Sequence, residues 1–336
     1  MTNKERLQAN NAKIEEIQNA LSGKIIEANK DMEKFLDGTL EEFDNRNYGI
    51  KSFEKYKFYK FNNLGKIVLG DVEKIGAYAF YNAGVDAEQK SFDLNTTLPC
   101  YIDDYAFYDS ALTSIKGTFT HCGDNCFSLN DSLTDVDITI NGRARQYMFY
   151  NDKNVVSFKF NPKSVITTYI EPYMCYNLGS NRPNPENNIF ELDFRNSTFD
   201  STYGAYAFAN TTYFRTYFPS TLTSISNYTF QSSSNNVVYF SRPTPATIGA
   251  NAFSLATNYK IFVPYNNINT HKVATNWTKH ADYIYGWAEE NTFEQGAMLP
   301  TTSDEGLSLT WYSDENLTTP VTSVEDPSKI YYCIGV

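Results

Sequence analysis

The chain has 336 residues, a net charge of −11 and a sequence pI near 4.8. This acidic balance argues against nucleic acid or an anionic membrane as a partner. No stretch approaches the ~18–20 consecutive apolar residues of a membrane span. The N-terminus also lacks the apolar core of a secretory signal, so we expect synthesis in the cytoplasm.

The first predicted element is a helix over residues 3–36. Leu7, Ile14 and Leu21 lie seven residues apart, and Ile17 occupies a d-like place. This seam covers only two to three heptads, whereas a sustained coiled coil shows about three to four. Two interpretations stay open for residues 1–37: self-association, with a trimer as the expected homo-oligomer, or an N-terminal cap on the domain that follows.

The same segment carries a resemblance. Residues from Thr2 to Leu21 resemble the N-termini of tail and baseplate-associated proteins in phages of Gram-positive bacteria. The resemblance implies that this end attaches a distal module to phage tail or baseplate proteins. It therefore implies a tail-associated location on the virion, reached after synthesis in the bacterial cytoplasm.

A short motif then returns about every 22 residues. It reads Ile-Gly-Ala-Tyr-Ala-Phe over 75–80, and similar hexapeptides occupy 102–107, 225–230 and 248–253. Weaker copies complete a column at Phe58, Phe80, Phe107, Phe127, Phe149, Cys175, Phe208, Phe230 and Phe253. A fixed period of this length predicts a solenoid of about nine stacked coils over residues 38–264, with the column buried in one continuous core.

Between the motifs lie alternating, strand-length runs. They include residues 66–69, 156–160, 189–194, 237–240 and 260–263. One such run per coil predicts a parallel sheet with a spacing of about 4.8 Å. The expected fold class is thus a β-dominated repeat solenoid with one parallel strand and short turns or helices in each coil.

The repeat motif resembles that of the BspA-like leucine-rich repeat family. The Ile-Gly-x-Tyr-Ala-Phe motif, the Leu-Thr-Ser-Ile runs at 112–115 and 222–225, and the Val-Pro at 263–264 carry the resemblance, which covers about residues 38–285. It implies a leucine-rich-repeat-like solenoid, and residues 265–288 look like the helical C-terminal cap of such arrays. The sequence departs from the family in coils four to six, where inserts such as residues 179–187 break the period.

A small β module is predicted behind this cap, over residues 289–336. It contains three strand-like runs at 307–312, 320–324 and 329–334. Its length is marginal for independent folding, so we expect it to lean on the solenoid or on a partner chain.

No segment predicts catalysis, a cofactor or a bound metal. Nucleophile elbows, zinc-protease helices and phosphate-binding loops are absent from the sequence. His121, Cys122 and Cys126 have a metal-like spacing, but both cysteines fall on core places of the repeat and a closed zinc site needs four ligands. A glycosidase needs only two suitably placed carboxylates, so a glycan-active enzyme is kept as the least favoured alternative.

The strand register predicts an outward-facing column. Aligning the coils gives Val68, Asp93, Lys116, Asp137, Lys159, Asp193, Tyr217, Tyr239 and Phe262. The last three would form an aromatic ladder for stacking sugars or docking a protein, and the alternative is that these rings pack under the cap region. The candidate ligand-binding residues are Tyr217, Tyr239, Phe262, Tyr213, Arg215, Asp193 and Lys159.

We therefore expect a non-catalytic binding protein. The favoured hypothesis is a phage or prophage tail-associated receptor-binding protein that recognises a cell-surface glycan or protein of a bacterial host. The alternative is a BspA-like adhesin on the cell surface. The inserted loops of the middle coils are a second possible recognition surface, because function often lies in loops on a rigid scaffold.

Overall fold

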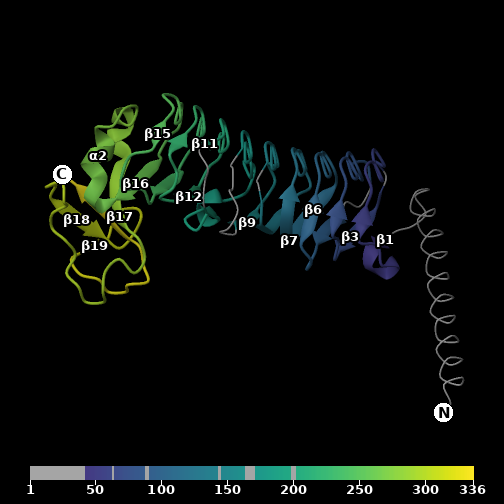
Figure 1. Cartoon of the computed structure of the whole chain (residues 1–336), viewed down its shortest axis with the longest axis horizontal. Helices are drawn as coiled ribbons and strands as arrows, with labels where there is room; N and C mark the ends of the chain where they lie inside the picture. The colour runs from purple at the N-terminus through teal and green to yellow at the C-terminus, as the bar shows by residue number, and fades with distance from the viewer. Residues whose placement is uncertain (1–41, 63, 88–90, 143–144, 163–170, 198–201) are drawn as a thin grey trace, which may run out of the picture.

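The computed structural model describes residues 42–62, 64–87, 91–142, 145–162, 171–197 and 202–336. The predicted N-terminal helix and its attachment role lie outside these residues. The described chain winds into an elongated solenoid that runs from β1 (Glu42–Asp44) to a C-terminal β module (Figure 1). The predicted fold class is confirmed.

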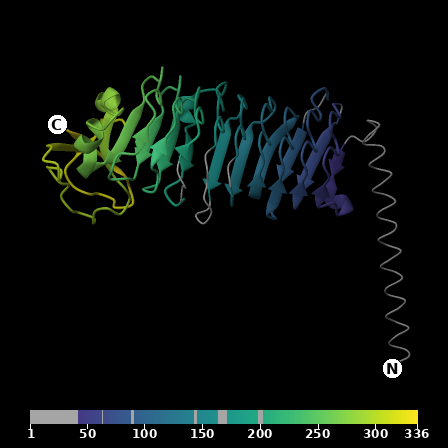
Figure 2. The same cartoon turned by 45° about the horizontal axis from the view of Figure 1, so that its top comes forward.

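Each coil contributes one strand to a long parallel sheet (Figure 2). After β1 its strands are β3 (Lys66–Gly70), β5 (Ser91–Asn95), β7 (Leu112–Cys122), β8 (Asp135–Ile140), β9 (Ser157–Pro162), β10 (Phe190–Asp193), β12 (Phe214–Phe218), β14 (Val237–Phe240), β16 (Lys260–Pro264) and β17 (Ile284–Ala288). In most of these strands buried and exposed residues alternate, so one face lines the core and the other faces outward.

Shorter strands form a second side of the coils. The first set is β2 (Ser52–Phe53), β4 (Lys74–Ile75) and β6 (Cys100–Ile102), which pairs with the second half of β7. The second set is a separate parallel sheet of β11 (Thr202–Tyr203), β13 (Ser224–Ile225) and β15 (Thr247–Ile248). Short 3-10 turns η1 (Asn45–Tyr48) and η2 (Pro185–Asn187) complete the solenoid.

The predicted phenylalanine column is confirmed as the core. Phe80 and Phe107 stack with ring centroids 5.2 Å apart, and Phe127 lies 5.7 Å from Phe107 and 5.6 Å from Phe149. All four rings are fully buried. A single coil has no partner for such a ring, so stacking of coils supplies most of the stability. Burial of each ring contributes roughly 1.5–3 kcal/mol.

The motif glycine lets neighbouring coils approach. A Cβ atom added to Gly76 would lie 2.6 Å from the backbone nitrogen of Lys55, and one on Gly204 would lie 2.2 Å from that of Pro172. Real Cβ atoms do not come this close to backbone, so any larger residue would push the coils apart. This explains why the motif starts with Ile-Gly in several coils.

The turn segments form a third side, which carries two rows of tyrosines that we call the tyrosine ladder. The side chains are half-buried or exposed. The first row is Tyr56, Tyr78, Tyr105, Tyr147, Tyr173, Tyr206 and Tyr228, and the second is Tyr59, Tyr81, Tyr108, Tyr150 and Tyr176. The sequence pattern showed the repeat of these tyrosines but not their stacking.

The C-terminal end combines helical turns with antiparallel strands. The turns η3 (Tyr265–Asn267), α2 (Ile268–Lys272) and η4 (Thr278–Tyr283) precede β17, and the module strands are β18 (Leu309–Tyr312), β19 (Pro320–Val321) and β20 (Tyr331–Gly335). Strand β20 pairs antiparallel with both β17 and β18, so the module extends the long sheet. Glu305 accepts hydrogen bonds from the backbone of Asn269 and Thr270 and fastens the module to α2.

Two further sequence features can be placed. Cys122 and Cys126 are fully buried free thiols in the core, as the repeat register predicted. No helix among the described residues is long and apolar enough to cross a membrane.

Candidate binding face on the long sheet

The outward face of the long sheet carries charges of both signs in register. Strand pairing places Asn95 beside Lys116, Lys116 beside Asp137, Asp137 beside Lys159 and Lys159 beside Glu191. The Lys116 ammonium lies 4.0 Å from the Asp137 carboxylate, and both side chains are about half exposed. Exposed pairs of this kind contribute little to stability, so these charges remain available to a ligand.

The predicted outward column is wrong at two steps. Strand β7 has a bulge at Thr113, and Asp93 lies beside Ser114 and not beside the expected Lys116. Lys159 lies beside Glu191 and not beside Asp193. In both cases the expected and the observed neighbour are two residues apart in the chain. The side chain therefore lies on the expected face of the sheet, but its neighbour is about 7 Å further along the strand.

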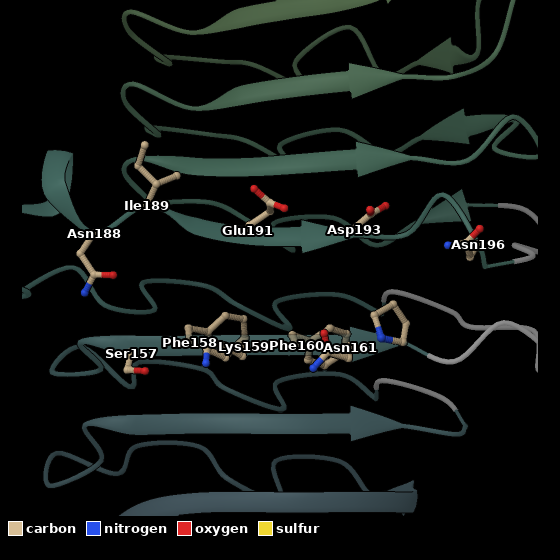
Figure 3. A pocket seen from close by; sticks show the side chains of 11 residues that line it. Ser157, Phe158, Lys159, Phe160, Asn161, Asn188, Ile189, Glu191, Asp193 and Asn196 are labelled. Atoms are coloured by element: carbon tan, nitrogen blue, oxygen red, sulfur yellow. The ribbon is translucent and has the colours of Figure 1, made fainter. Parts of the chain in front are cut away.

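A groove opens where β9 and β10 diverge. These strands share only two residue pairs, whereas β8 and β9 share six. The hollow between them measures about 520 Å³, and Figure 3 shows Glu191 and Asp193 on β10 with Lys159 on the neighbouring strand β9. A second hollow of about 500 Å³ over β3 to β9 shares Ser157 and Lys159 with the first. The two hollows adjoin at Ser157 and Lys159, and we call them together the polar groove because charged side chains line both.

The inserts that break the repeat shape this groove. Asn188, at the end of the inserted loop, donates its amide to the carbonyl of Val156 across the divergent strands. Arg182 in the same loop is buried, stacks 4.0 Å from the Phe190 ring and donates to the carbonyls of Gly179 and Asn188. The loop thus fills the widened coil from inside and leaves the outward face open.

The electrostatics of the groove differ between its two acids. Partial desolvation in the hollow raises the pKa of Glu191; the Arg215 guanidinium opposes this rise, and the Asp193 carboxylate adds to it. Asp193 accepts hydrogen bonds from the Arg195 guanidinium at 3.0, 3.1 and 2.7 Å and from the Arg195 backbone N–H at 2.9 Å, and Arg195 also contacts Glu290 at 2.5 Å. Asp193 is therefore engaged, whereas Glu191 and Lys159 form no ion pair with each other or with another side chain in the part of the chain that the structure describes.

The predicted aromatic ladder exists, but it is not an open platform. Tyr217 stacks 4.3 Å from Tyr239, which stacks 5.1 Å from Phe262. The side chains of Tyr217, Tyr239 and Phe262 are only 5%, 0% and 0% exposed, because Trp287 and Tyr332 cover them. The expectation of an exposed column is wrong for these three positions: exposed rings would lose the burial energy that the C-terminal module supplies.

Tyr213 and Arg215 line another hollow, of about 390 Å³, beside the C-terminal module. The Arg215 guanidinium lies 2.5 Å from the Glu315 carboxylate, which also accepts a hydrogen bond of 3.0 Å from the Tyr239 hydroxyl. Lys260 donates to the backbone carbonyl of Glu315 at 2.8 Å. Arg215 therefore helps to fasten the module, and its use in ligand binding stays a prediction, as does that of Tyr213.

Sequence reasoning missed Glu191, Arg195, Glu290 and Glu315. Glu191 left a local signal, because it precedes Asp193 by two residues and so shares its face of the strand. Arg195 is also only two residues from its partner Asp193, whereas the contacts of Glu290 with Arg195 and of Glu315 with Arg215 join distant parts of the chain. Within the described residues, no group of three histidine, cysteine or acidic side chains is placed to hold a metal ion.

Comparison with known families gives one match. The family described as BspA type leucine rich repeat region matches residues 30–87, 86–202 and 186–276, in six copies. The matched segments cover both the groove and the tyrosine ladder. No curated protein matches the chain.

Proposed function

Because the chain belongs to the BspA-type leucine-rich repeat family, we propose that it is a non-catalytic binding protein that recognises a cell-surface protein or glycan. The observation that carries this proposal is the polar groove on the outward face of the long sheet. Solenoids use such extended faces to bind partners. The strands hold the backbone of Lys159 and Glu191 in place, so little backbone entropy is lost on binding.

The chemistry of the groove favours a protein over a sugar as its ligand. Charges of opposite sign alternate along it, which suits a polypeptide with both acidic and basic side chains. The aromatic rings that would stack on a sugar, Tyr217 and Tyr239, are covered on this face. We therefore place an extended, mixed-charge segment of a cell-surface protein in the groove, with a glycan as the second choice.

We propose two settings for this binding. In the first the chain is a tail-associated, host-adsorption protein of a phage or prophage, supported by the resemblance of residues 2–21 to tail and baseplate-associated proteins. In the second it is a surface adhesin, a role typical of proteins with this kind of repeat. Detection of the chain in purified phage particles induced from the producing strain supports the first setting, and its presence on the producing cells supports the second.

Cell binding tests the groove directly. The labelled full chain is added to a panel of bacterial cells that are untreated, protease-treated or periodate-treated. We expect binding that protease abolishes and that Lys159→Glu reduces at least tenfold, because this change places three acids side by side with Asp137 and Glu191. Lys329→Glu is the matched control, since it makes the same charge change on the module.

The outcomes separate the ligand classes. Loss of binding after periodate alone would replace the protein ligand by a glycan. Equal binding of Lys159→Glu and Lys329→Glu would remove the groove from the proposal.

Light scattering tests the oligomeric part of the proposal. The full chain is compared with a chain that starts at Asp37. A trimer that becomes a monomer on truncation supports an attachment and oligomerisation role for residues 1–37. A monomer in both cases supports an N-terminal cap and the adhesin setting.

A catalytic role would rest on Glu191 and Asp193. Glycosidases use two carboxyl groups, one of them with a raised pKa, and Glu191 has this property. Arg195 engages Asp193, which favours binding over catalysis. Release of reducing sugars from cell-wall polysaccharide that stops in Glu191→Gln would overturn the non-catalytic proposal.

A further inference from the structure

The tyrosine ladder uses twelve of the chain's 26 tyrosines, seven in the first row and five in the second. It lies on the turn side of the coils, away from the groove. Neighbouring first-row rings are stacked, with interplanar angles from 5° between Tyr78 and Tyr105 to 28° between Tyr56 and Tyr78. Stacking thus fixes the rings before any ligand arrives.

The fold itself does not require tyrosine at these positions. Every first-row tyrosine has a left-handed backbone with φ between 56° and 64°, and Asn125 occupies the same place in coil four with φ 55°. This conformation costs a residue with a bulky side chain roughly 1–2 kcal/mol, whereas asparagine tolerates it better. One stacked pair returns about 0.5–1.5 kcal/mol. Stacking therefore roughly offsets the backbone cost, and burial of part of each ring adds further stability.

The ladder is interrupted at one coil. In coil four, Asn125 stands at the first-row place and Ser128 at the second-row place. The backbone stays in register across this coil: Tyr105 donates to the carbonyl of Asp124 at 2.8 Å, and Asn125 donates to that of Gln146 at 3.1 Å. The coils therefore do not close up, and the flanking rings stand two coil steps, about 10 Å, apart.

This interruption has two aromatic sides and a polar floor. Tyr105 and Tyr108 form one side with ring centroids 5.5 Å apart, and Tyr147 and Tyr150 form the other at 5.3 Å. Each first-row ring here has an aromatic neighbour on one side only, within the residues that the structure describes. The fully buried Ser128 hydroxyl donates to the Tyr147 carbonyl and also lies 3.2 Å from the oxygen of the Asn125 amide. The Asn125 amide nitrogen donates no hydrogen bond among those same residues.

We propose that this interruption is a sugar-binding site, in which one pyranose ring of a neutral glycan lies between the two pairs of tyrosines. At the first-row place, where Asn125 is only half-buried, the spacing of the flanking coils corresponds to one missing ring. The C–H faces of a pyranose carry partial positive charge and are attracted by the negative faces of aromatic rings. The free amide nitrogen of Asn125 and the tyrosine hydroxyls then hydrogen-bond to the sugar hydroxyls.

Other flat ligands fit the site less well. A nucleobase would bring phosphates to a chain with a net charge of −11. An aromatic side chain of a protein would leave the Asn125 amide covered and without a partner, which costs free energy. A neutral sugar satisfies both the rings and the amide, so it is the ligand to which the geometry points.

Filling the interruption tests the proposal. The full chain and its variants are applied to an array of neutral oligosaccharides, and the retained sugars are measured again in solution by saturation-transfer NMR. We expect the wild-type chain to retain at least one neutral oligosaccharide. Asn125→Tyr combined with Ser128→Tyr should reduce this binding at least tenfold, because tyrosines at these places occupy the site as they do in the neighbouring coils.

Two further variants keep the test decisive. Asn251→Tyr adds a tyrosine at the first-row place of coil nine, outside the interruption, and should bind as the wild type does. Tyr147→Leu removes one side without filling the site and should also lose binding, which covers the case in which the double variant does not fold. The proposal is overturned if no neutral sugar is retained, if the filled variant binds as tightly as the wild type, or if Asn251→Tyr loses binding equally. Lys159→Glu changes the sheet face and leaves the sugar site intact. It should therefore bind the neutral sugar as the wild type does, so the two proposals are tested independently.

Discussion

The burial of the aromatic column depends on one acidic side chain of the C-terminal module, and its replacement tests that account. Glu315 faces Arg215 at 2.5 Å and accepts a hydrogen bond from the Tyr239 hydroxyl. In Glu315→Gln the amide oxygen can still accept from Tyr239, but the negative charge opposite Arg215 is gone. We expect the module to detach from the solenoid more readily in this variant.

The size of the effect follows from burial. The side chains of Arg215 and Glu315 are 31% and 14% exposed. Breaking a fully buried ion pair costs about 3–5 kcal/mol, whereas an exposed pair contributes about 0.2–1 kcal/mol. A partly exposed pair lies between these limits, so the expected loss in the free energy of unfolding is about 1–3 kcal/mol.

Tryptophan fluorescence is the suitable assay. The three tryptophans, Trp277, Trp287 and Trp311, are all buried at the C-terminal end, so they report on this end alone, while circular dichroism reports on the whole sheet. Coils contact only their neighbours, so one end can unfold first. In Glu315→Gln the fluorescence transition in guanidinium should precede the circular dichroism transition.

Glu325→Gln is the matched control, because Glu325 is an exposed acid on the same module. A surface change of this kind shifts stability by less than about 0.5 kcal/mol. If Glu315→Gln and Glu325→Gln unfolded at the same denaturant concentration, the ion pair with Arg215 would not be what holds the module on the aromatic column.

Three further predictions concern the core and its titratable groups. Phe127→Ala should cost about 3–5 kcal/mol in urea denaturation, because the buried ring leaves a cavity; a loss below about 1 kcal/mol would contradict the stacked core. Burial raises the pKa of Asp152. The contribution of Asp152 to the free energy of unfolding is therefore greatest at low pH and is lost as pH rises from about 3.9 towards the folded-state pKa. Asp152→Asn should remove this pH-dependent destabilisation and raise the melting temperature at pH 7. Burial lowers the pKa of His280, so stability falls as pH drops below about 6.5; His280→Gln should flatten that acid limb in melting curves.

The sequence was sufficient for the fold because every coil must solve the same packing problem. Each coil buries one ring against its neighbours, so Phe80, Phe107 and Phe127 recur with a visible period. The pairing of residues on the outward face is not constrained in this way, because these side chains need not pack against the next coil. Asp93 pairs with Ser114 and Lys159 pairs with Glu191, and no periodic pattern in the sequence indicates either pairing.

The exposure of the aromatic column was unpredictable for a different reason. Tyr217, Tyr239 and Phe262 alternate correctly to face outward, and nothing near them in the chain covers them. Their cover comes from Trp287 and Tyr332, and for Tyr217 the latter lies more than a hundred residues away in the chain. A local pattern reports the face on which a side chain lies, but not which distant segment packs on that face.

The two surfaces proposed here differ in a way that makes their relation testable. The groove uses the outward face of the long sheet, the sugar site uses the turn side, and the buried phenylalanine column lies between them. If the coils stay rigid, a change at one site does not alter the geometry of the other. The free-energy changes caused by substitutions at the two sites should then add.

We therefore expect Lys159→Glu and the filled variant, Asn125→Tyr with Ser128→Tyr, to have independent effects. Binding of the triple variant to whole cells should fall by the product of the two separate losses. A smaller combined loss would mean that both changes weaken contact with the same ligand, which would then span the core from one side of the coils to the other. A larger loss would mean that the two sites bind parts of one surface cooperatively, through the gain in effective concentration that linked binding sites provide.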